Sequence, residues 1–271
     1  MMRVHVDYVT RYEYDTPARL IQQVLRMTPR PYDGQHVRDW RVEIDGDGRL
    51  RAGEDALGNV VHMLSLAGPV RRLMARVIGE VDTSDTGGMV HGAIERFPPA
   101  VFLRETDLTR CDAALHAFAA EVAAKGGSKL DQLHALLGAL NEQVAFDTSP
   151  TTSTTTAAEA FAMKRGVCQD LSHIFIGAAR VMGMPARYVS GHLARSDGEI
   201  DQEAGHAWCE TYVEDLGWVG FDAANGVCPT DAYVRVAIGL DYLGAAPVRG
   251  SRYGGGGEQL DVKLRVTPAG Q

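Results

Sequence analysis

The spacing of the apolar residues changes twice along the chain, and this change constrains the fold more than any other feature. In the first hundred residues apolar and polar residues alternate, as in "RVHVDYV" and "VRDWRVEI", which is the pattern of half-buried β-strands. The turn signals "DGDG" and "LGN" separate such segments. We therefore predict a β-sandwich-like module over residues 1–100, with a linker where Pro98 and Pro99 stop any regular element.

Helical spacing replaces the alternation in the next part of the chain. In "TRCDAALHAFAAEVAAKGG" and "SKLDQLHALLGALNEQVAF" the apolar residues recur three and four positions apart. Ser128 is placed to cap the second helix. Cys111 lies on the apolar stripe of the first helix and is most simply a core residue.

Alternation returns from residue 186 in "ARYVSGHLA", "GHAWCETYV", "WVGFDAA" and "YVRVAIG". We expect residues 101–250 to form one core and residues 251–271 to form a flexible glycine-rich linker followed by a last strand. That strand is expected to pair with one of the two sheets.

Composition excludes several classes of protein. The 271 residues include 35 acidic and 27 basic ones, for a net charge of -8. No basic face is visible, which argues against a nucleic-acid binder and against adsorption to an anionic membrane. The four cysteines, at 111, 168, 209 and 228, show no close pairing, as is typical of free thiols in a reducing compartment. The sequence has neither a signal peptide nor an apolar run long enough to span a bilayer, so we expect a cytoplasmic protein.

Cys168 stands where a third helix is predicted to begin. Apolar residues at helical spacing follow it in "CQDLSHIFIGAARVM", and Gly166 precedes it and allows a sharp bend. A thiol in the first turn of a helix lies near free backbone N–H groups and the positive end of the helix dipole, both of which favour the thiolate. A buried core thiol is an equally simple interpretation.

A nucleophilic thiol needs a base and a group that orients the base. His206 opens one alternating strand and Asp222 ends the next, and both are equally distant from Glu214 in the turn. A tight hairpin with this register places the two side chains opposite or nearly opposite each other on one face, about 5 Å apart at Cβ. A bulge would shift the register by one residue.

The segments "GVCQD", "HAWCE" and "WVGFD", in the order Cys, His, Asp, resemble the transglutaminase-like superfamily. The resemblance extends to "YDTPARLIQQVLRMTPR" and "GLDYLGAAPVRG", which are similar to the N-terminal region and to the segment after the core in bacterial transglutaminase-like proteins. It implies an α+β fold, in which a papain-like core of helices packed on an antiparallel sheet follows the β-rich module. Gly244 departs from the pattern, since members often carry an acidic residue there, and this departure bears on substrate contacts.

The resemblance also implies site roles: Cys168 as nucleophile, His206 as general base and then acid, and Asp222 as its orienter, with the backbone N–H of Cys168 in an oxyanion hole. We expect no cofactor and no metal: some members use calcium, but calcium needs clustered oxygen ligands, and the few in "EIDGDG" are explained more simply by a turn between strands. The expected activity is a cysteine peptidase or amidase that forms a thioester on a peptide or carboxamide substrate. Transglutaminase-type acyl transfer to an amine, and a non-catalytic binding scaffold, are the alternatives.

Zinc binding by Cys168, His206, Cys209 and Cys228 is a further alternative, which their scattered spacing disfavours. Among the neighbours, Trp208 is expected on the His206 face, where it could form a wall of the site, and Cys209 on the opposite face. Asp170 is expected to stabilise the start of the helix rather than to take part in chemistry.

Overall fold

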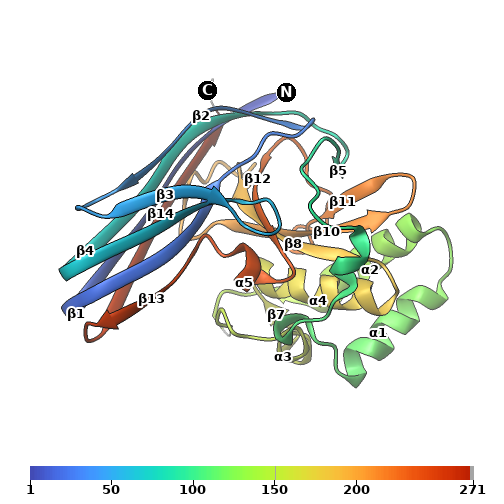
Figure 1. Cartoon of the computed structure of the whole chain (residues 1–271). Helices are drawn as coiled ribbons and strands as arrows, with labels where there is room; N and C mark the ends of the chain where they lie inside the picture. The colour runs from blue at the N-terminus through green and yellow to red at the C-terminus, as the bar shows by residue number, and fades with distance from the viewer. Residues whose placement is uncertain (150, 269–271) are drawn as a thin grey trace.

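The computed structural model, which describes residues 1–149 and 151–268, consists of two antiparallel sheets and a group of helices (Figure 1). The helices are α1 (Ala113–Ala124), α2 (Lys129–Gln143), α3 (Ala157–Met163), α4 (Cys168–Val181) and α5 (Tyr242–Ala245), with 3-10 turns η1 (Pro99–Leu103) and η2 (Asp107–Thr109). The strands are β1 (Met2–Thr28), β2 (Gln35–Ile44), β3 (Arg49–Glu54), β4 (Val60–Thr83), β5 (Met89–Val90), β6 (Ala145–Phe146), β7 (Arg165–Gly166), β8 (Ala186–Leu193), β9 (Asp201–Gln202), β10 (His206–Val213), β11 (Gly217–Phe221), β12 (Tyr233–Gly239), β13 (Val248–Gly254) and β14 (Glu258–Pro268).

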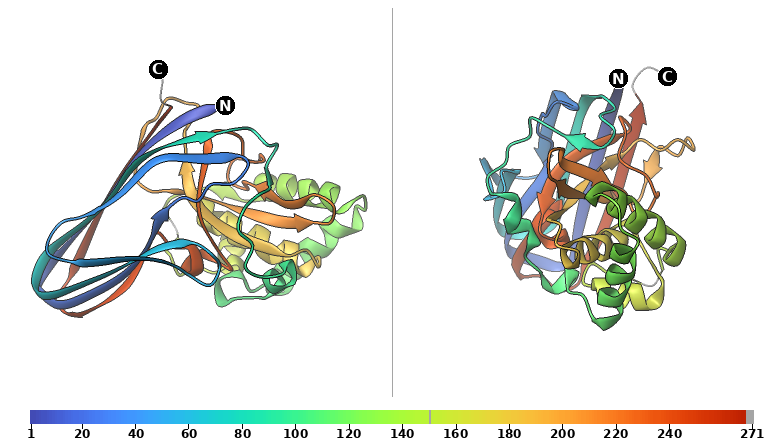
Figure 2. Two further views of the ribbon diagram at one scale, coloured as in Figure 1. Left: turned by 45° about the horizontal axis from the view of Figure 1, so that its top comes forward. Right: turned by 90° about the vertical axis from the view of Figure 1, so that its right-hand side faces the viewer.

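The first sheet folds over onto itself because its two longest strands, β1 and β4, bend in the middle (Figure 2). Their pairing is irregular between Glu13 and Ala18, and Pro17 falls within this interval. On one side of the bend, β1 pairs with β14 and β4 pairs with β2. On the other side, β1 pairs with β13 and β4 pairs with β3. Buried side chains from both halves form one apolar cluster, which includes Tyr12, Ile21, Leu64 and Leu73. The folded sheet is therefore the sandwich-like module that the alternating pattern predicts.

The last two strands return to the first sheet, so the two ends of the chain lie side by side (Figure 1). β14 pairs with β1 from Val4 to Tyr14, and β13 pairs with β1 from Ala18 to Leu25. The predicted pairing of the last strand with a sheet is thus found. The glycine run is not a flexible linker, however, since it connects β13 to β14 at the bend of β1, along which both strands pair, and Gly254 and Gly255 there have φ of 72° and 82°. Residues 269–271 of the predicted segment lie outside the described residues.

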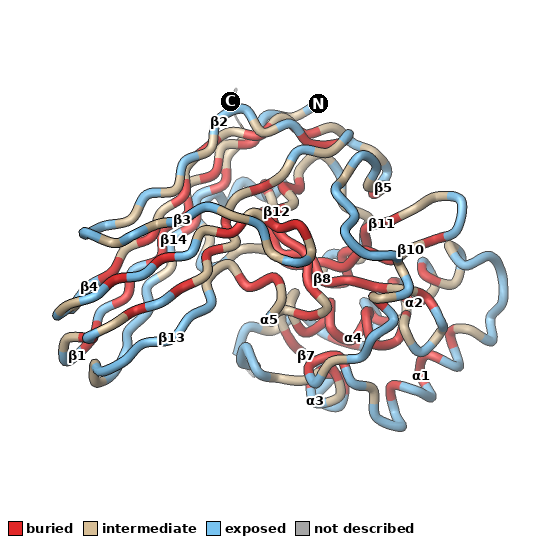
Figure 3. The backbone as a smooth tube through the Cα atoms, in the orientation of Figure 1, coloured by how far each residue is buried: buried red, intermediate tan, exposed pale blue. Residues whose placement is uncertain are grey.

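The second sheet has the strand order β12-β8-β10-β11-β5, and α4 packs against β8 and β10 (Figure 3). All ten residues from Asp170 to Ala179 are buried, because α1, α2 and α3 also pack on α4. Phe175 of α4 stacks on Phe221 of β11 with ring centroids 5.3 Å apart. A Cβ at Gly177 would lie 2.7 Å from the Cys111 sulfur, so the chain before α1 packs closely on α4 there. Cys111 is partly buried against the core, but it precedes α1 and does not lie on the stripe of that helix as predicted.

α2 begins at the cap that the sequence predicts. Ser128 accepts a hydrogen bond from the backbone of Asp131 at 3.1 Å and caps α2, and Asp112 caps α1 in the same manner. Within the described residues, the helices are all too short or too polar to cross a membrane.

Candidate active site

Cys168 is the first residue of α4, as predicted. The helix start is held by Asp170, whose Oδ2 accepts a hydrogen bond from the backbone N–H of Val167 at 2.8 Å. A Cβ at Gly166 would lie 2.7 Å from the Asp170 carboxylate. Gly166 is therefore required because it leaves space for this cap, and not because the backbone adopts a positive φ.

His206 and Asp222 lie in direct contact: Nε2 of His206 is 2.6 Å from Oδ2 of Asp222. The hairpin register differs from the predicted one, since Cys209 pairs with Phe221 and Val213 with Gly217. The turn is thus centred on Asp215, which has φ of 69°, and the register is shifted by two residues. Because a shift of two keeps every side chain on its face, His206 and Asp222 still share a face but are diagonal neighbours.

Asp222 is fully buried and accepts five hydrogen bonds. Its Oδ2 accepts from His206, from the Tyr233 hydroxyl at 2.7 Å and from the Asn225 side chain at 2.7 Å. Its Oδ1 accepts from the backbone N–H groups of Ala224 and Asn225 at 3.0 and 3.2 Å. Burial raises the pKa of Asp222, but these bonds and the charge of His206 outweigh it, so that the pKa lies below its usual value. Asp222 is therefore a carboxylate with a fixed orientation.

The imidazole of His206 interacts with the Asp222 carboxylate and is influenced by the Cys168 thiol. Burial lowers the pKa of His206, but the hydrogen bonds to Asp222 and Cys168 and the charges of both groups raise it, to about 10. Since Nε2 is used by Asp222, Nδ1 is the nitrogen left for the thiol. The site thus combines a thiol at a helix N-terminus, a buried imidazole that favours its protonated form, and a fixed carboxylate.

Two aromatic rings enclose the imidazole. Trp208 stacks on His206 with ring centroids 6.2 Å apart, on the face that the strand alternation predicts. The Tyr233 ring lies 5.8 Å from the His206 ring. Trp218 of β11 instead packs against the guanidinium of Arg187, whose carbon lies 3.8 Å from the centroid of the Trp218 ring.

The other cysteines do not join the site as metal ligands. Cys209 points to the opposite side of β10, is fully buried, and its thiol lies 3.1 Å from the Phe221 carbonyl. Burial raises the pKa of Cys228 and of Cys111, the latter to about 11. Among residues 1–149 and 151–268, no group of three or more histidine, cysteine or acidic side chains is placed to hold a metal ion.

His173 of α4 has a structural position. Its Nε2 accepts a hydrogen bond from the backbone N–H of Tyr242 at 3.0 Å, and burial lowers its pKa to about 3. It therefore stays neutral and connects α5 to α4.

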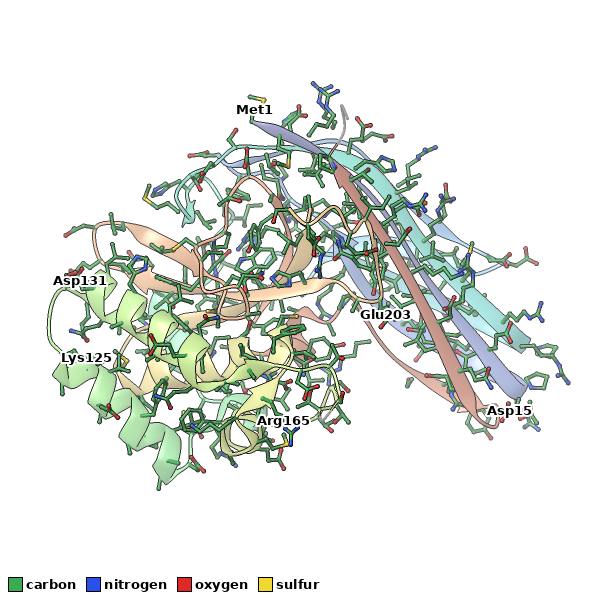
Figure 4. The ribbon with its side chains drawn as sticks, turned by 180° about the vertical axis from the view of Figure 1, so that it is seen from behind. Met1, Asp15, Lys125, Asp131, Arg165 and Glu203 are labelled. Carbon is green, nitrogen blue, oxygen red and sulfur yellow. The ribbon has the colours of Figure 1, made fainter. Side chains whose placement is uncertain are left out.

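A surface hollow of about 870 Å³ lies on the outer face of the first sheet and is lined by residues of β1, β4, β14 and residues 201–203. The loop that carries Glu203 lies beside β14 (Figure 4). Most of its charges pair with each other, as Arg76 does with Asp7 and Arg265 with Asp201. Cys168, His206 and Asp222 do not line it.

Sequence reasoning missed Tyr233 and Asn225. Asn225 lies in the turn three residues after Asp222, where an asparagine usually indicates a turn only. Tyr233 is the first residue of the next strand, and no spacing rule relates it to a carboxylate eleven residues earlier.

Comparisons with known proteins place these residues in a family. The transglutaminase-like superfamily model matches residues 116–223, and the model of the bacterial transglutaminase-like N-terminal region matches residues 4–82. An uncharacterised protein of Mycobacterium leprae is 29% identical over 98% of this chain and 99% of its own length. One from Mycobacterium tuberculosis is 26% identical over 98% of this chain and 93% of its own length.

A solved structure from Cytophaga hutchinsonii, provisionally described as a cysteine protease, has the same fold. It covers 100% of this chain and 91% of its own, with a TM-score of 0.81 and 19% sequence identity.

Proposed function

The chain belongs to the transglutaminase-like superfamily, a family of cysteine-dependent enzymes, and from this premise we propose that it is a peptidase or amidase that cleaves peptide or carboxamide bonds through a thioester. The observation that carries the proposal is the 2.6 Å contact of His206 with the buried Asp222 carboxylate, together with Cys168 at the N-terminus of α4.

In the proposed reaction, the Cys168 sulfur attacks the substrate carbonyl carbon and its proton resides on His206. The carbonyl oxygen becomes an oxyanion, which the free backbone N–H of Cys168 in the first turn of α4 can bind. When the C–N bond breaks, His206 transfers the proton to the leaving amine and a thioester remains. Water then attacks the thioester, His206 accepts its proton, and the acid leaves as the thiol is restored.

Asp222 has the role of keeping the imidazole ring in the orientation that this proton transfer requires. Its own orientation comes from the bonds of Tyr233, Asn225 and the backbone. The stacked Trp208 restricts the ring from the other side.

The test is the pH dependence of Cys168 alkylation by iodoacetamide, followed by mass spectrometry in the parent protein and in His206→Ala. We expect fast alkylation of Cys168 below pH 7 that His206→Ala abolishes. Cys228, which is also half-buried, is the internal control and should react slowly in both proteins. If Cys168 reacts no faster than Cys228, the thiolate–imidazolium pair is absent and the scaffold alternative is preferred.

A substrate screen decides between the two reactions of the thioester. Peptide and glutamine amides are offered with and without a primary amine, and the products are identified by mass. Release of the free acid in both cases supports the hydrolase, whereas incorporation of the amine supports a protein-glutamine acyltransferase.

We further propose a peptide or protein substrate and a cytoplasmic location. The location is supported by the four cysteines, which are all free thiols, as expected in a reducing compartment. Oxidation of the purified protein in air, followed by a thiol count, tests whether they stay unpaired.

A further inference from the structure

Tyr233 connects the site to the strand at the edge of the second sheet. It is the first residue of β12, and its hydroxyl donates to the same Asp222 oxygen that accepts from His206. The β10–β11 ladder ends at the Cys209–Phe221 pair, one residue before Asp222. The hairpin ladder therefore does not extend to the carboxylate, and Tyr233 supports it from a different strand, β12.

β12 is itself held by two amide side chains of the first sheet. Oε1 of Gln35 accepts from the backbone N–H of Arg235, and Nε2 of Gln35 donates to the Arg235 carbonyl, both at 2.8 Å. Oδ1 of Asn59 accepts from the N–H of Ile238, and its Nδ2 donates to the Ile238 carbonyl, again both at 2.8 Å. Each amide thus makes the pair of bonds that a neighbouring strand would make.

These two amides bind β12 where its pairing within the sheet is weak. The register between β12 and β8 shifts between Arg235 and Ala237, and β12 is the edge strand of the sheet. Gln35 and Asn59 are only 2% and 5% exposed, so solvent does not compete for these bonds. Asp55 accepts a further bond from the Asn59 side chain at 2.9 Å and fixes its orientation.

We propose that the first sheet positions the active site: Gln35 and Asn59 hold β12 so that Tyr233 keeps Asp222, and through it His206, in place. This inference rests on the proposed function. Gln35, Asn59 and Tyr233 are positioning residues, since they reach the reacting atoms only through Asp222. A carboxylate that orients a base must be held within about 0.5 Å of its working position, and a buried network of this kind can do so.

The test is a double-mutant cycle of Tyr233→Phe and Gln35→Met, read by the pH profile of Cys168 alkylation. Phe keeps the ring against Trp208, and Met keeps the length of Gln35 without its hydrogen bonds. We expect Tyr233→Phe to move the low-pH limb of the profile upward by about one pH unit, a roughly tenfold slower alkylation on that limb. Gln35→Met should move it in the same direction by less, and should add nothing in the Tyr233→Phe background.

Gln23→Met is the matched control. Gln23 is also a buried glutamine of the first sheet, 8% exposed, and its side-chain oxygen makes no hydrogen bond to β12 within the described residues. It should leave the profile unchanged. Thermal unfolding by circular dichroism shows that each variant is folded.

A second readout separates this inference from the proposed function. The titration of His206, followed by NMR, needs neither a reactive thiol nor a substrate. Gln35→Met should lower the pKa of His206 while Gln23→Met does not, even if the parent proves inactive. The inference is overturned if Gln35→Met and Gln23→Met behave alike in both readouts, or if the effects of Gln35→Met and Tyr233→Phe simply add.

Discussion

Gly191 lies directly across the β8–β10 ladder from His206. A Cβ at this position would lie 2.1 Å from the Val234 carbonyl oxygen and 2.5 Å from the Trp208 ring. Trp208 is the ring that stacks on His206. The absence of a side chain at Gly191 therefore allows β12 and Trp208 to approach the candidate base.

Replacement of Gly191 by Ala should displace the tryptophan and the β12 backbone. We expect a loss of about 1–3 kcal/mol in the free energy of unfolding, as for other overpacked sites, and slower alkylation of Cys168. Urea denaturation gives the first quantity. Gly138→Ala on the exposed side of α2 is the control, since nothing lies within 4 Å of its Cβ; it should stabilise by about 0.5–1 kcal/mol. Equal effects at the two glycines would contradict the packing argument.

Two substitutions of Asp222 can separate its role in orienting the His206 ring from the effect of its negative charge. In Asp222→Asn the amide oxygen can still accept from His206, Tyr233 and Asn225, whereas Asp222→Ala removes every bond. We expect Ala to lower turnover by about 10²–10⁴-fold, the range of a lost acid–base arrangement, and Asn to lower it much less.

The pH profile gives the charge effect in the same variants. The pKa of His206 is about 10 because Asp222 and Cys168 stabilise the imidazolium, so the alkaline limb of activity should lie near that value in the parent. Removing the charge in Asp222→Asn should move this limb to lower pH. If the limb stays where it is, Asp222 is not the group that raises the pKa of His206.

His192 should make the protein less stable in acid. It is buried between Tyr8 and Trp40, with ring centroids 5.8 and 6.4 Å away, and neither of its nitrogens has a partner among the described residues. Burial lowers its pKa from 6.5 to about 4. Between these two values the unfolded chain binds a proton that the folded chain does not, so stability falls as the pH falls from 6.5 to 4.

For His192→Phe, the prediction concerns the stability lost between two pH values. The change in packing caused by the substitution is the same at both values and therefore cancels. The stability lost between pH ~7.5 and ~4.5 should become about 2–3 kcal/mol smaller than in the parent. Chemical denaturation at both pH values measures it. An unchanged difference would mean that His192 is solvated or paired in the folded protein.

The buried ion pairs of Glu210 with Arg187 and Arg235 should be sensitive to the loss of one charged group. Glu210 is fully buried and accepts from Arg187 at 2.6 Å and from Arg235 at 2.7 and 3.1 Å. Burial raises its pKa, but the two guanidinium groups lower it, to about 2. Glu210→Gln removes the carboxylate that Arg187 and Arg235 share; Arg187 keeps Glu95, at 2.7 and 3.0 Å, whereas Arg235 loses the charged group to which it donates.

We expect Glu210→Gln to cost about 3–5 kcal/mol in the free energy of unfolding, as for a buried pair that loses one ion. The control is Glu13→Gln, because Glu13 pairs with Arg72 on the surface, with side chains 58% and 79% exposed, and such pairs contribute little. A small effect at Glu210 would indicate that water reaches the network. Thermal and urea unfolding measure both variants.

Much of this protein follows from local patterns in its sequence. Cys168 begins a helix because helical spacing starts there and Asp170 caps the preceding backbone, and Ser128 caps α2 for the same local reason. Alternation alone placed His206 and Asp222 on one face of a hairpin. The shared face was predicted correctly although the predicted register was wrong by two residues, because a shift by an even number of residues leaves every side chain on its face of the strand.

Other features depend on residues far apart in the sequence, and only the tertiary structure decided them. The glycine run after β13 has the composition of a linker, but it is an ordered connection at the bend of the sheet because β13 and β14 both pair with β1, more than two hundred residues earlier. The bonds from Tyr233 to Asp222 and from Gln35 to Arg235 likewise join segments that no periodicity relates. The sequence by itself determined the helices, the strands and the faces of the site residues, since these depend on neighbours within one turn or one hairpin. The supports of Asp222 arise from packing one sheet against another, which local spacing does not encode.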